Sequence, residues 1–468
     1  MTLPEEFIKY TRELMGDSRF ESLVAGLTDA APVSIRLNPL KCDVTDTVIT
    51  EKKGDVPWCP MGVYLNDRPN FTFDPLLHAG VYYVQEASSM FVTHVLRQTV
   101  TDSVRMLDLC AAPGGKSTAC RTILPEGSLL ISNEPVRTRA NILSENMQKF
   151  GHPDVMVTNN YPRDFRKSGL MFDVILADVP CSGEGMFRKD EGAISEWSVQ
   201  NVENCRRLQR EIVSDIWPCL KPGGLIIYST CTFNAHEDEE NAAWIAKELG
   251  ADFVEIAVSP EWNITGPLTG DNPSYRFLPG TSEGEGLFMT VLRKHGQYES
   301  PAKASANKKQ NRKTDKAVNL PLTDSDDFET REKGDRLVAI PKRWSDAYDT
   351  AAKSLNVIHA GVTIGTRKGK DIVPDQSLAL STRLDRSRFV CIAIDYPQAI
   401  NYLRKEAVPL PDGTPKGFVL LTYKGMPLGF EKNIGNRANN LYPQEWKIKS
   451  QHIPEQNEII IKRNETIS

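Results

Sequence analysis

Short apolar runs alternate with longer segments of helical periodicity along residues 104–294. The apolar runs are continuous rather than interrupted at every second position, which is typical of strands buried on both faces of a parallel sheet. The segments between them are long enough for covering helices, so the pattern predicts an α/β domain. The predicted strands are 104–109, 128–133, 155–159, 172–179, 224–230, 252–256 and 286–294, and the clearest helices are 138–150, 195–220 and 237–249.

Two regions flank this pattern. Residues 1–75 predict a separate small α/β domain, with an amphipathic helix at its start and a strand at Ser34–Asn38. Residues 298–335 hold a basic stretch and then an acidic one, with few large apolar side chains, and predict a linker without a core of its own. The chain is thereby divided into an N-terminal domain (1–75), a core domain (76–297), this linker and a C-terminal region (336–468).

The composition is that of a globular protein, with 40% hydrophobic and 25% charged residues over 468 positions. No apolar run approaches the ~18–20 residues of a membrane span, and the polar N-terminus has no signal-peptide core. The nine cysteines are an odd number and include no Cys-x-x-Cys pair, which argues against a disulfide framework and a cysteine zinc site. We therefore expect a cytoplasmic protein without a metal, and a monomer by default.

The charge is distributed unevenly along the chain. Residues 336–468 contain 20 Lys and Arg against 13 Asp and Glu, a surplus of seven positive charges. Because the whole chain carries −5, the residues before them carry −12. The basic C-terminal region is either a footprint for a polyanion or a merely solvated surface, and the charge alone does not decide between the two.

A glycine loop follows the first predicted strand of the core domain, in Asp108-Leu-Cys-Ala-Ala-Pro-Gly-Gly-Lys-Ser-Thr118. Gly114 and Gly115 allow a ligand to approach the backbone, and a helix expected to begin near Lys116 presents free N–H groups. The loop lacks both the GxxxxGK[ST] pattern of a phosphate-binding loop and GxGxxG. Glu134 ends the second strand, where an acid is placed to bind two ribose hydroxyls. Loop and acid together favour a ribose-containing ligand over an ordinary strand–loop–helix connection.

Two cysteines and an acid follow later strands of the same sheet. Asp178 and Cys181 come after the fourth strand, in DVPCSGEGM, and Cys231 comes after the fifth, in STCT. In an open α/β sheet the ligand crevice lies at the carboxyl ends of the strands, so these side chains converge on the edge that carries the glycine loop. A single such cysteine is more often a small buried hydrophobe, but two in one crevice favour catalysis.

Four motifs in this order, DLCAAPGGKST, NEP, DVPCSGEGMFRKD and STCTFNAHEDEENA, resemble the RNA (cytosine-5) methyltransferases, and most of all their bacterial small-subunit (16S rRNA) branch. Ahead of them, Arg36-Leu-Asn38-Pro and residues 80–89 (GVYYVQEASS) are similar to N-terminal motifs of that family. Behind the linker, residues 415–468 resemble its PUA-like RNA-binding end on KGF, PLGFEK and NLYP. The resemblance covers most of the chain.

The resemblance implies a Rossmann-like methyltransferase core with a mostly parallel seven-stranded sheet, a C-terminal α+β region, and S-adenosylmethionine as the methyl donor. It implies Cys231 as nucleophile and Cys181 as helper thiol, with Asp178 and Lys116 as the other catalytic residues. The implied donor-binding residues are Cys110, Ala111, Ala112, Pro113, Gly114, Gly115, Lys116, Glu134, Arg139, Asn160 and Asp178. Two positions depart from the family pattern: Asn160 stands where an acid often contacts the adenine, and Lys149 stands where arginine is frequent.

The implied reaction is methyl transfer to C5 of a cytosine in RNA, most simply 16S rRNA, through a covalent bond from cysteine to C6. RNA contacts are expected from the N-terminal domain and the C-terminal region, because the body of the chain is acidic. Two alternatives stay open: a tRNA cytosine-5 methyltransferase, and a non-catalytic RNA-binding ribosome assembly factor. An adenine amino-group methyltransferase would need a polar-Pro-Pro-aromatic motif after the fourth strand, and a small-molecule methyltransferase has no use for the two thiols.

Overall fold

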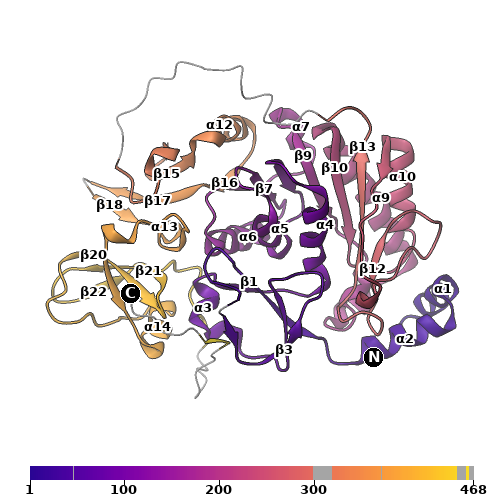
Figure 1. The fold of residues 1–468 in the computed structure, drawn as a ribbon, viewed down its shortest axis with the longest axis horizontal. Coiled ribbons are helices and arrows are strands. Elements are labelled where there is room, and N and C mark those ends of the chain that lie inside the picture. Colours follow the sequence, from indigo (N-terminus) through magenta and orange to yellow (C-terminus); the bar gives the residue numbers. More distant parts are fainter. Residues whose placement is uncertain (46, 299–318, 370, 451–459, 463–468) are drawn as a thin grey trace.

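The computed structural model describes residues 1–45, 47–298, 319–369, 371–450 and 460–462. Figure 1 shows a central sheet with the C-terminal sheets on one side and helices α1 (Glu5–Met15) and α2 (Asp17–Thr28) on the other. No helix in these residues is both long and apolar enough to cross a membrane. Within the same residues, no three His, Cys, Asp or Glu side chains are grouped as metal ligands would be.

The core domain is built on one nine-stranded sheet that contains all seven predicted strands. Its strands are β6 (Arg105–Asp108), β7 (Leu129–Asn133), β8 (Val155–Thr158), β9 (Phe172–Asp178), β10 (Leu220–Thr230), β11 (Ala251–Phe253), β12 (Tyr275–Phe277), β13 (Leu287–Lys294) and β16 (Val357–Ala360). The order is β11-β13-β10-β9-β6-β7-β8-β16, with β12 paired to β13. Strands β8, β7, β6, β9 and β10 are parallel, whereas β13 and β16 run antiparallel to their neighbours. This order confirms the predicted Rossmann-like fold.

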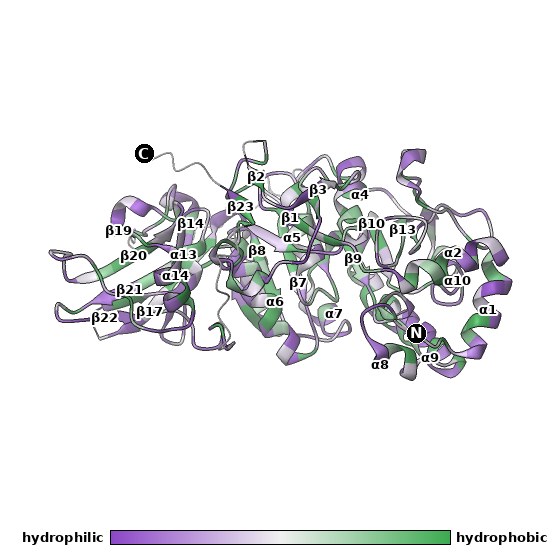
Figure 2. Ribbon diagram, turned by 90° about the horizontal axis from the view of Figure 1, so that it is seen from below, coloured by the Kyte–Doolittle hydropathy of each residue, from purple (hydrophilic) through white to green (hydrophobic). Residues whose placement is uncertain are grey.

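Helices cover both faces of this sheet, as the continuous apolar strands predict. Successive residues of a strand point to opposite faces, so Met106 and Leu107 enter two different cores. The first core includes α4 (Phe91–Thr99), α5 (Gly115–Ile123) and α6 (Arg137–Phe150), and the second includes α7 (Asp164–Ser168), α9 (Val199–Ile216) and α10 (Glu239–Leu249). In Figure 2 the strands of the central sheet are mostly hydrophobic, whereas the helices mix hydrophobic and hydrophilic residues.

The N-terminal residues form two helices and a separate small sheet. Helices α1 and α2 pack on the core domain, where Phe7 and Phe20 join a cluster with Trp197 and Phe233. Their approach is close, because a Cβ on Gly26 would lie 2.2 Å from a backbone nitrogen of the core domain. The predicted boundary at residue 75 therefore separates these helices from the core-domain residues that they contact.

A small antiparallel sheet follows these helices, in the order β3 (Lys52–Asp55), β4 (Gly62–Leu65), β1 (Val33–Leu37), β5 (Tyr82–Val84). Its last strand lies beyond the predicted boundary. The sheet docks on the C-terminal end of α6: Lys41 Nζ donates to the Lys149 carbonyl (2.6 Å), and a Cβ on Gly80 would lie 1.8 Å from the same oxygen. Because Gly80 also has a φ of 70°, only glycine suits this contact. The remaining short elements are α3 (Pro75–His78), α8 (Glu191–Glu196) and the pair β2 (Val48–Ile49) and β23 (Ile461–Lys462).

In the residues that the structure describes, the C-terminal region and the end of the linker form two four-stranded sheets and three α-helices. The first sheet contains β14 (Phe328–Lys333), β15 (Arg336–Pro341), β17 (Val362–Lys368) and β18 (Asp371–Pro374). The second contains β19 (Val390–Ala393), β20 (Gly417–Tyr423), β21 (Met426–Asn433) and β22 (Ala438–Asn440). The helices are α12 (Ser345–Ser354), α13 (Gln376–Leu380) and α14 (Tyr396–Leu403).

The linker and the C-terminal region differ from their predicted outlines. Residues 299–318 of the predicted linker lie outside the described residues, but its second half contains β14, which pairs with β15 and buries Phe328. Strand β16 comes from the C-terminal region and extends the nine-stranded sheet beside β8. The C-terminal region is therefore joined to the core domain through a shared sheet, because β8 would otherwise be an unpaired edge.

Candidate active site

The glycine loop between β6 and α5 lines a cavity of about 200 Å³ at the carboxyl edge of the sheet. Helix α5 begins at Gly115, close to the predicted start. The Asn146 side chain donates to the Pro113 carbonyl (2.8 Å) and Arg139 donates to the Ala112 carbonyl (3.1 Å), so α6 holds the loop from outside. The predicted donor-loop residues that line the cavity are Cys110, Ala111, Ala112, Pro113, Gly115 and Lys116. Gly114 is not among them; its φ of 115° turns the chain into α5.

Asp108 lies beneath the loop at the base of this cavity and is fully buried. Its Oδ2 accepts a hydrogen bond from the Ser117 hydroxyl (2.6 Å), which anchors the first turn of α5. Its Oδ1 is buried and, among the described residues, has no hydrogen-bond partner. Burial raises the pKa of Asp108 to about 7. The free carboxyl oxygen makes Asp108 an acceptor available to a ligand in the cavity.

Glu134 ends β7, as predicted, with 1% of its surface exposed. One carboxylate oxygen accepts from the backbone N–H of Val136 (3.0 Å), and the other lies 3.6 Å from the Arg139 guanidinium. Arg139 thus contacts both the acid and the glycine loop. The two residues lie together at one side of the loop, where the sequence places a ribose.

Asn160 follows β8 and contacts the C-terminal region. Its Oδ1 accepts a hydrogen bond from the backbone N–H of Asn356 (3.0 Å), the residue immediately before β16. Its Nδ2 is buried and has no hydrogen-bond partner among the described residues. The amide donor is therefore free for a ligand, whereas the amide oxygen is already used.

Asp178 and Lys116 form an ion pair where β9 meets the start of α5. Lys116 Nζ lies 2.9 Å from Asp178 Oδ2, and the Ser229 hydroxyl donates to Oδ1 (2.9 Å). Burial opposes the charge of Lys116, but the Asp178 carboxylate outweighs it and the net effect raises the pKa of the lysine. The structure therefore brings these two predicted catalytic residues together as a charged pair.

The two thiols that the sequence singles out also meet. Cys181 Sγ lies 3.1 Å from Cys231 Sγ, and the backbone N–H of Cys231 donates to Cys181 Sγ (3.4 Å). The hydrogen bond with Cys231, and then burial, hold the pKa of Cys181 well above its usual range. The geometry allows either sulfur to be the donor in this contact, and a thiol with a raised pKa, such as that of Cys181, retains the proton that a donor needs.

Two buried carboxylates, Glu184 and Glu237, brace the loops that carry these thiols. Glu184, three residues after Cys181, accepts from the backbone N–H groups of Phe233 (2.6 Å) and Asn234 (3.0 Å), beyond Cys231. Glu237, on the Cys231 side, accepts in turn from the backbone N–H of Ser182 (3.0 Å). Burial, and then repulsion by Glu184, raise the pKa of Glu237 to about 7. The crossed contacts fix one loop relative to the other.

Sequence reasoning missed both of these acids. Each stands inside a motif that was quoted for its cysteine, GEGM for Glu184 and AHEDEEN for Glu237. Charged residues in such motifs are normally solvated. The one signal in the sequence that they are buried is their closeness to the two cysteines.

The strand order, the glycine loop and the residues at the sheet edge define a Rossmann-like methyltransferase. Two solved structures of Pyrococcus horikoshii proteins share this fold: a methyltransferase homologue (TM-score 0.53, 22% identity, 62% of this chain and 95% of that one) and NSun6 with SFG (TM-score 0.53, 20% identity, 63% and 99%). At these identities the likeness establishes the fold alone.

The chain belongs to the 16S rRNA methyltransferase RsmB/F family, whose members are S-adenosylmethionine-dependent. Residues 95–293 match the model of that family, residues 3–87 match the N-terminal domain of 16S rRNA methyltransferase RsmF, and residues 389–448 match the methyltransferase RsmF PUA domain. Two proteins named ribosomal RNA small subunit methyltransferase F are similar along their whole length. That of Aliivibrio fischeri is 30% identical over 95% of this chain and 97% of its own, and that of Serratia proteamaculans 29% over 95% and 96%.

These matches confirm the predicted family and fold class, and that the protein is an rRNA methyltransferase with an N-terminal domain and a PUA domain. The PUA match begins at residue 389, at the start of the second C-terminal sheet, whereas the sequence placed the PUA-like part at 415–468. The N-terminal match ends at residue 87, beyond β5, in agreement with the sheet rather than with the predicted boundary.

Proposed function

We propose that this chain transfers a methyl group from S-adenosylmethionine to C5 of a cytosine in 16S rRNA, through a covalent bond between Cys231 and C6. The observation that carries the proposal is the 3.1 Å contact of Cys181 with Cys231 beside the Lys116–Asp178 pair. The names of the relatives support 16S rRNA as the substrate, and the PUA match supports an RNA partner.

The residues around the glycine loop fit this methyl donor. The donor carries an ammonium group, ribose hydroxyls and an adenine, and three side chains offer matching groups. The unpartnered Oδ1 of Asp108 suits the ammonium group, the Glu134 carboxylate suits the ribose hydroxyls, and the unpartnered Nδ2 of Asn160 suits a ring nitrogen of the adenine. When bound, the donor supplies the electrophilic methyl group.

Cys231 activates C5 of the cytosine, which by itself is a poor nucleophile. Its thiolate adds to C6, N3 takes a proton that the Lys116–Asp178 pair supplies, and the ring becomes an enamine whose C5 attacks the methyl group. Because the Lys116–Asp178 pair is already in place to protonate N3, it also stabilises the charge that develops in the transition state of addition. Lys116 interacts electrostatically with Cys231, so its positive charge lies near the sulfur that adds to C6.

Cys181 acts after methyl transfer. The C5 proton leaves to solvent, and the C6–S bond breaks with its electrons returning to sulfur as the Cys231 thiolate. N3 gives its proton back to the Lys116–Asp178 pair, which restores the neutral ring. Because Cys181 keeps its own proton, its S–H donates to the departing thiolate and stabilises it. The brace formed by Glu184 and Glu237 holds the two sulfurs at the distance that this step needs.

Analysis of the methylated nucleoside tests the proposal. The enzyme is incubated with labelled S-adenosylmethionine and either 16S rRNA or assembled small subunits, and the RNA is digested to nucleosides for mass spectrometry. We expect the label in 5-methylcytidine. Label in a methylated adenosine or guanosine, or incorporation into tRNA but not into either form of 16S rRNA, would overturn it.

Removal of the Glu134 carboxylate, which we assign to the ribose hydroxyls, is expected to weaken binding of S-adenosylmethionine. Glu134→Ala deletes a charge-assisted hydrogen bond worth roughly 1.5 to 3 kcal/mol, so the Kd for S-adenosylmethionine should rise about tenfold or more. Calorimetric titration measures the Kd, and Glu145→Ala serves as the control, because Glu145 is an acid on α6 whose ion-pair partner is Lys149. An unchanged Kd in Glu134→Ala would contradict the assignment.

A further inference from the structure

Asn356 joins the C-terminal region to the sheet edge at which the donor-binding residues lie. It is an exposed residue directly before β16, and it contacts Asn159, which follows β8. Its backbone carbonyl accepts a hydrogen bond from the backbone N–H of Asn159 (3.0 Å), and its side-chain Nδ2 donates to Asn159 Oδ1 (3.4 Å). The Asn159 side chain is therefore held by a residue from beyond the linker.

The other end of the Asn159 amide reaches the turn that carries Glu134. Asn159 Nδ2 donates to the carbonyl oxygens of Glu134 (2.8 Å) and Pro135 (2.9 Å). The Glu134 carboxylate belongs to the same turn, because it accepts from the backbone N–H of Val136 (3.0 Å). Contacts that hold the two carbonyls therefore also hold the carboxylate that we assign to the ribose.

These contacts fix the orientation of the Asn159 amide. A backbone carbonyl only accepts hydrogen bonds, so the two carbonyls of the turn require the amide nitrogen of Asn159 on their side. The amide oxygen then faces Asn356, whose side-chain nitrogen is the donor that it needs. An acceptor-only side chain at position 356 would instead compete with the turn for the Asn159 nitrogen.

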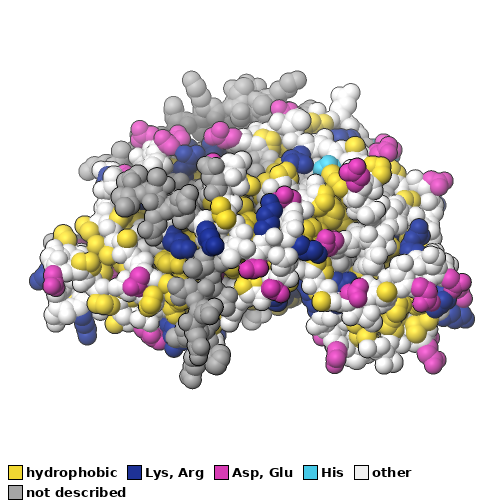
Figure 3. Space-filling model, turned by 60° about the horizontal axis from the view of Figure 1, so that its bottom comes forward, with side chains coloured by type: hydrophobic (Ala, Val, Ile, Leu, Met, Phe, Trp, Pro, Cys, Tyr) yellow, Lys and Arg dark blue, Asp and Glu magenta, His cyan; other side chains and the backbone are white. Residues whose placement is uncertain are grey.

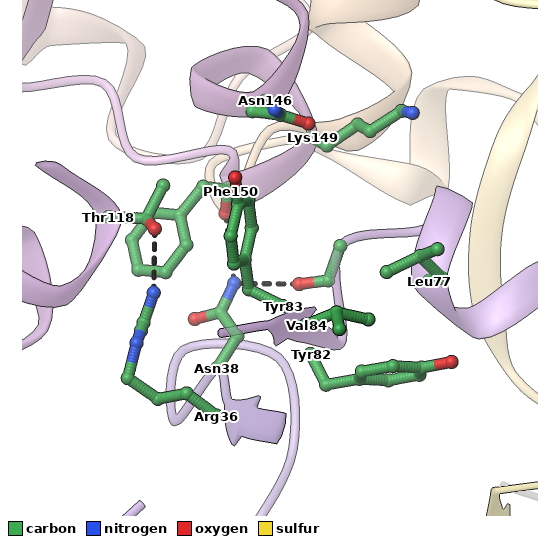
Figure 4. Close-up of a pocket in the computed structure, with 11 residues that line it drawn as sticks. Arg36, Asn38, Leu77, Tyr82, Tyr83, Val84, Thr118, Asn146, Lys149 and Phe150 are labelled. Atoms are coloured by element: carbon green, nitrogen blue, oxygen red, sulfur yellow. Dashed lines mark hydrogen bonds between the residues drawn. The ribbon is translucent and has the colours of Figure 1, made fainter. Parts of the chain in front are cut away.

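The C-terminal region is anchored firmly enough to support this contact. Arg343 and Asn356 stand on either side of α12, and Arg343 forms an ion pair with buried Asp154, directly before β8. Lys149, in the last turn of α6, extends away from the pocket drawn in Figure 4, and its Nζ lies 5.6 Å from the ring centre of Trp446. Helix α12 is thus tied to the core domain at both ends, which fixes the position of Asn356.

We propose that Asn159 is a positioning residue for the methyl donor, and that through it the C-terminal region sets the affinity for S-adenosylmethionine. The proposal rests on the proposed function in placing the ribose at Glu134. Asn159 and Asn356 act through the Glu134 turn and not by contact with the donor. The C-terminal region, from which the sequence predicts RNA contacts, thereby has a second role.

An exchange of amide for carboxylate at position 356 tests this relay. Asn356→Asp keeps the shape of the side chain, but its oxygens only accept, so they draw the Asn159 nitrogen away from the Glu134 turn. The Kd for S-adenosylmethionine, measured by calorimetric titration of the full-length enzyme without RNA, should rise about three- to tenfold, as expected for one lost neutral hydrogen bond. Asn356→Ala only deletes the 3.4 Å bond and should have a smaller effect. Because Asn356 is exposed, both variants should keep the thermal stability of the wild type.

A second carboxylate variant controls for the added charge. S-adenosylmethionine carries a net positive charge, so an extra acid by itself would strengthen its binding rather than weaken it. Asn439→Asp, exposed on β22, adds the same charge elsewhere in the C-terminal region and should leave the Kd unchanged. Acidic and basic side chains are interspersed on the face of the molecule that Figure 3 shows, so one more acid creates no new charged patch there.

A double-mutant cycle distinguishes positioning from a general structural effect. Asn159→Ala should weaken donor binding about three- to tenfold in the wild-type background, but it should have little further effect in Glu134→Ala, where the residue through which it acts is gone. An equal effect of Asn159→Ala in both backgrounds, or an unchanged Kd in Asn356→Asp, would overturn the proposal. If Glu134→Ala itself leaves the Kd unchanged, the ribose assignment in the proposed function fails first, and this proposal fails with it.

Discussion

Cys231→Ala is expected to abolish both methyl transfer and any covalent protein–RNA species, because C5 of the cytosine is never activated. Cys181→Ala is expected to do the opposite: addition and methyl transfer proceed, but the departing thiolate loses its hydrogen-bond donor. The family resemblance supplies this division of roles, and the 3.1 Å contact between the sulfurs places Cys181 where it can donate to Cys231. A covalent protein–RNA species should therefore accumulate in Cys181→Ala. A denaturing gel with labelled 16S rRNA, run with and without S-adenosylmethionine, shows both results.

The two cysteines provide their own control, since each substitution removes one sulfur from the same pair. Cys391→Ala, at an exposed position on β19 in the C-terminal region, is a further control that should turn over normally. Adduct in Cys231→Ala and none in Cys181→Ala would reverse the roles. Adduct in neither variant, together with normal turnover, would contradict a covalent mechanism.

The central sheet could be predicted from the sequence because its strands are buried on both faces. A strand such as Phe172–Asp178 is almost continuously apolar, and that pattern survives without knowledge of its neighbours. Strand β16 could not be found in this way. It lies about 60 residues beyond the core domain, and its pairing with β8 is a long-range contact that its own four residues do not encode.

The packing partner of the N-terminal helices could not be predicted for a related reason. The apolar face of α1 shows that Phe7 is buried, but not whether it is buried by its own sheet or by Trp197 of the core domain. The parallel sheet, by contrast, made the site residues predictable as a group, because strand ends meet at one edge. Asp178, Cys181 and Cys231 do meet at this edge. The hydrogen bond from Asn356 to Asn160 depends on the position of β16 and could not be predicted from the sequence.

Asp178→Asn is expected to have the second-largest effect on catalysis. The substitution keeps the shape of the side chain, but an amide nitrogen then faces Lys116 or Ser229 in place of a carboxylate oxygen. The charge that holds the proton for N3 is lost, so kcat should fall by roughly 10²- to 10³-fold, the usual loss when one preorganised electrostatic group is removed. Ser229→Ala, which removes a neutral hydrogen bond and leaves the ion pair intact, should cost tenfold or less.

The pH profile tells an electrostatic role from a structural one. In the wild type the Asp178 carboxylate raises the pKa of Lys116 against the effect of burial. Without that carboxylate burial acts alone, so the pKa of Lys116 falls and the lysine loses its proton at a lower pH. The residual kcat of Asp178→Asn should therefore decline with rising pH in a range where the wild type and Ser229→Ala keep their activity. Single-turnover rates measured across that pH range distinguish the two roles, provided that all three proteins have equal thermal stability. If the pH profile of Asp178→Asn runs parallel to that of the wild type, Asp178 has only a structural role.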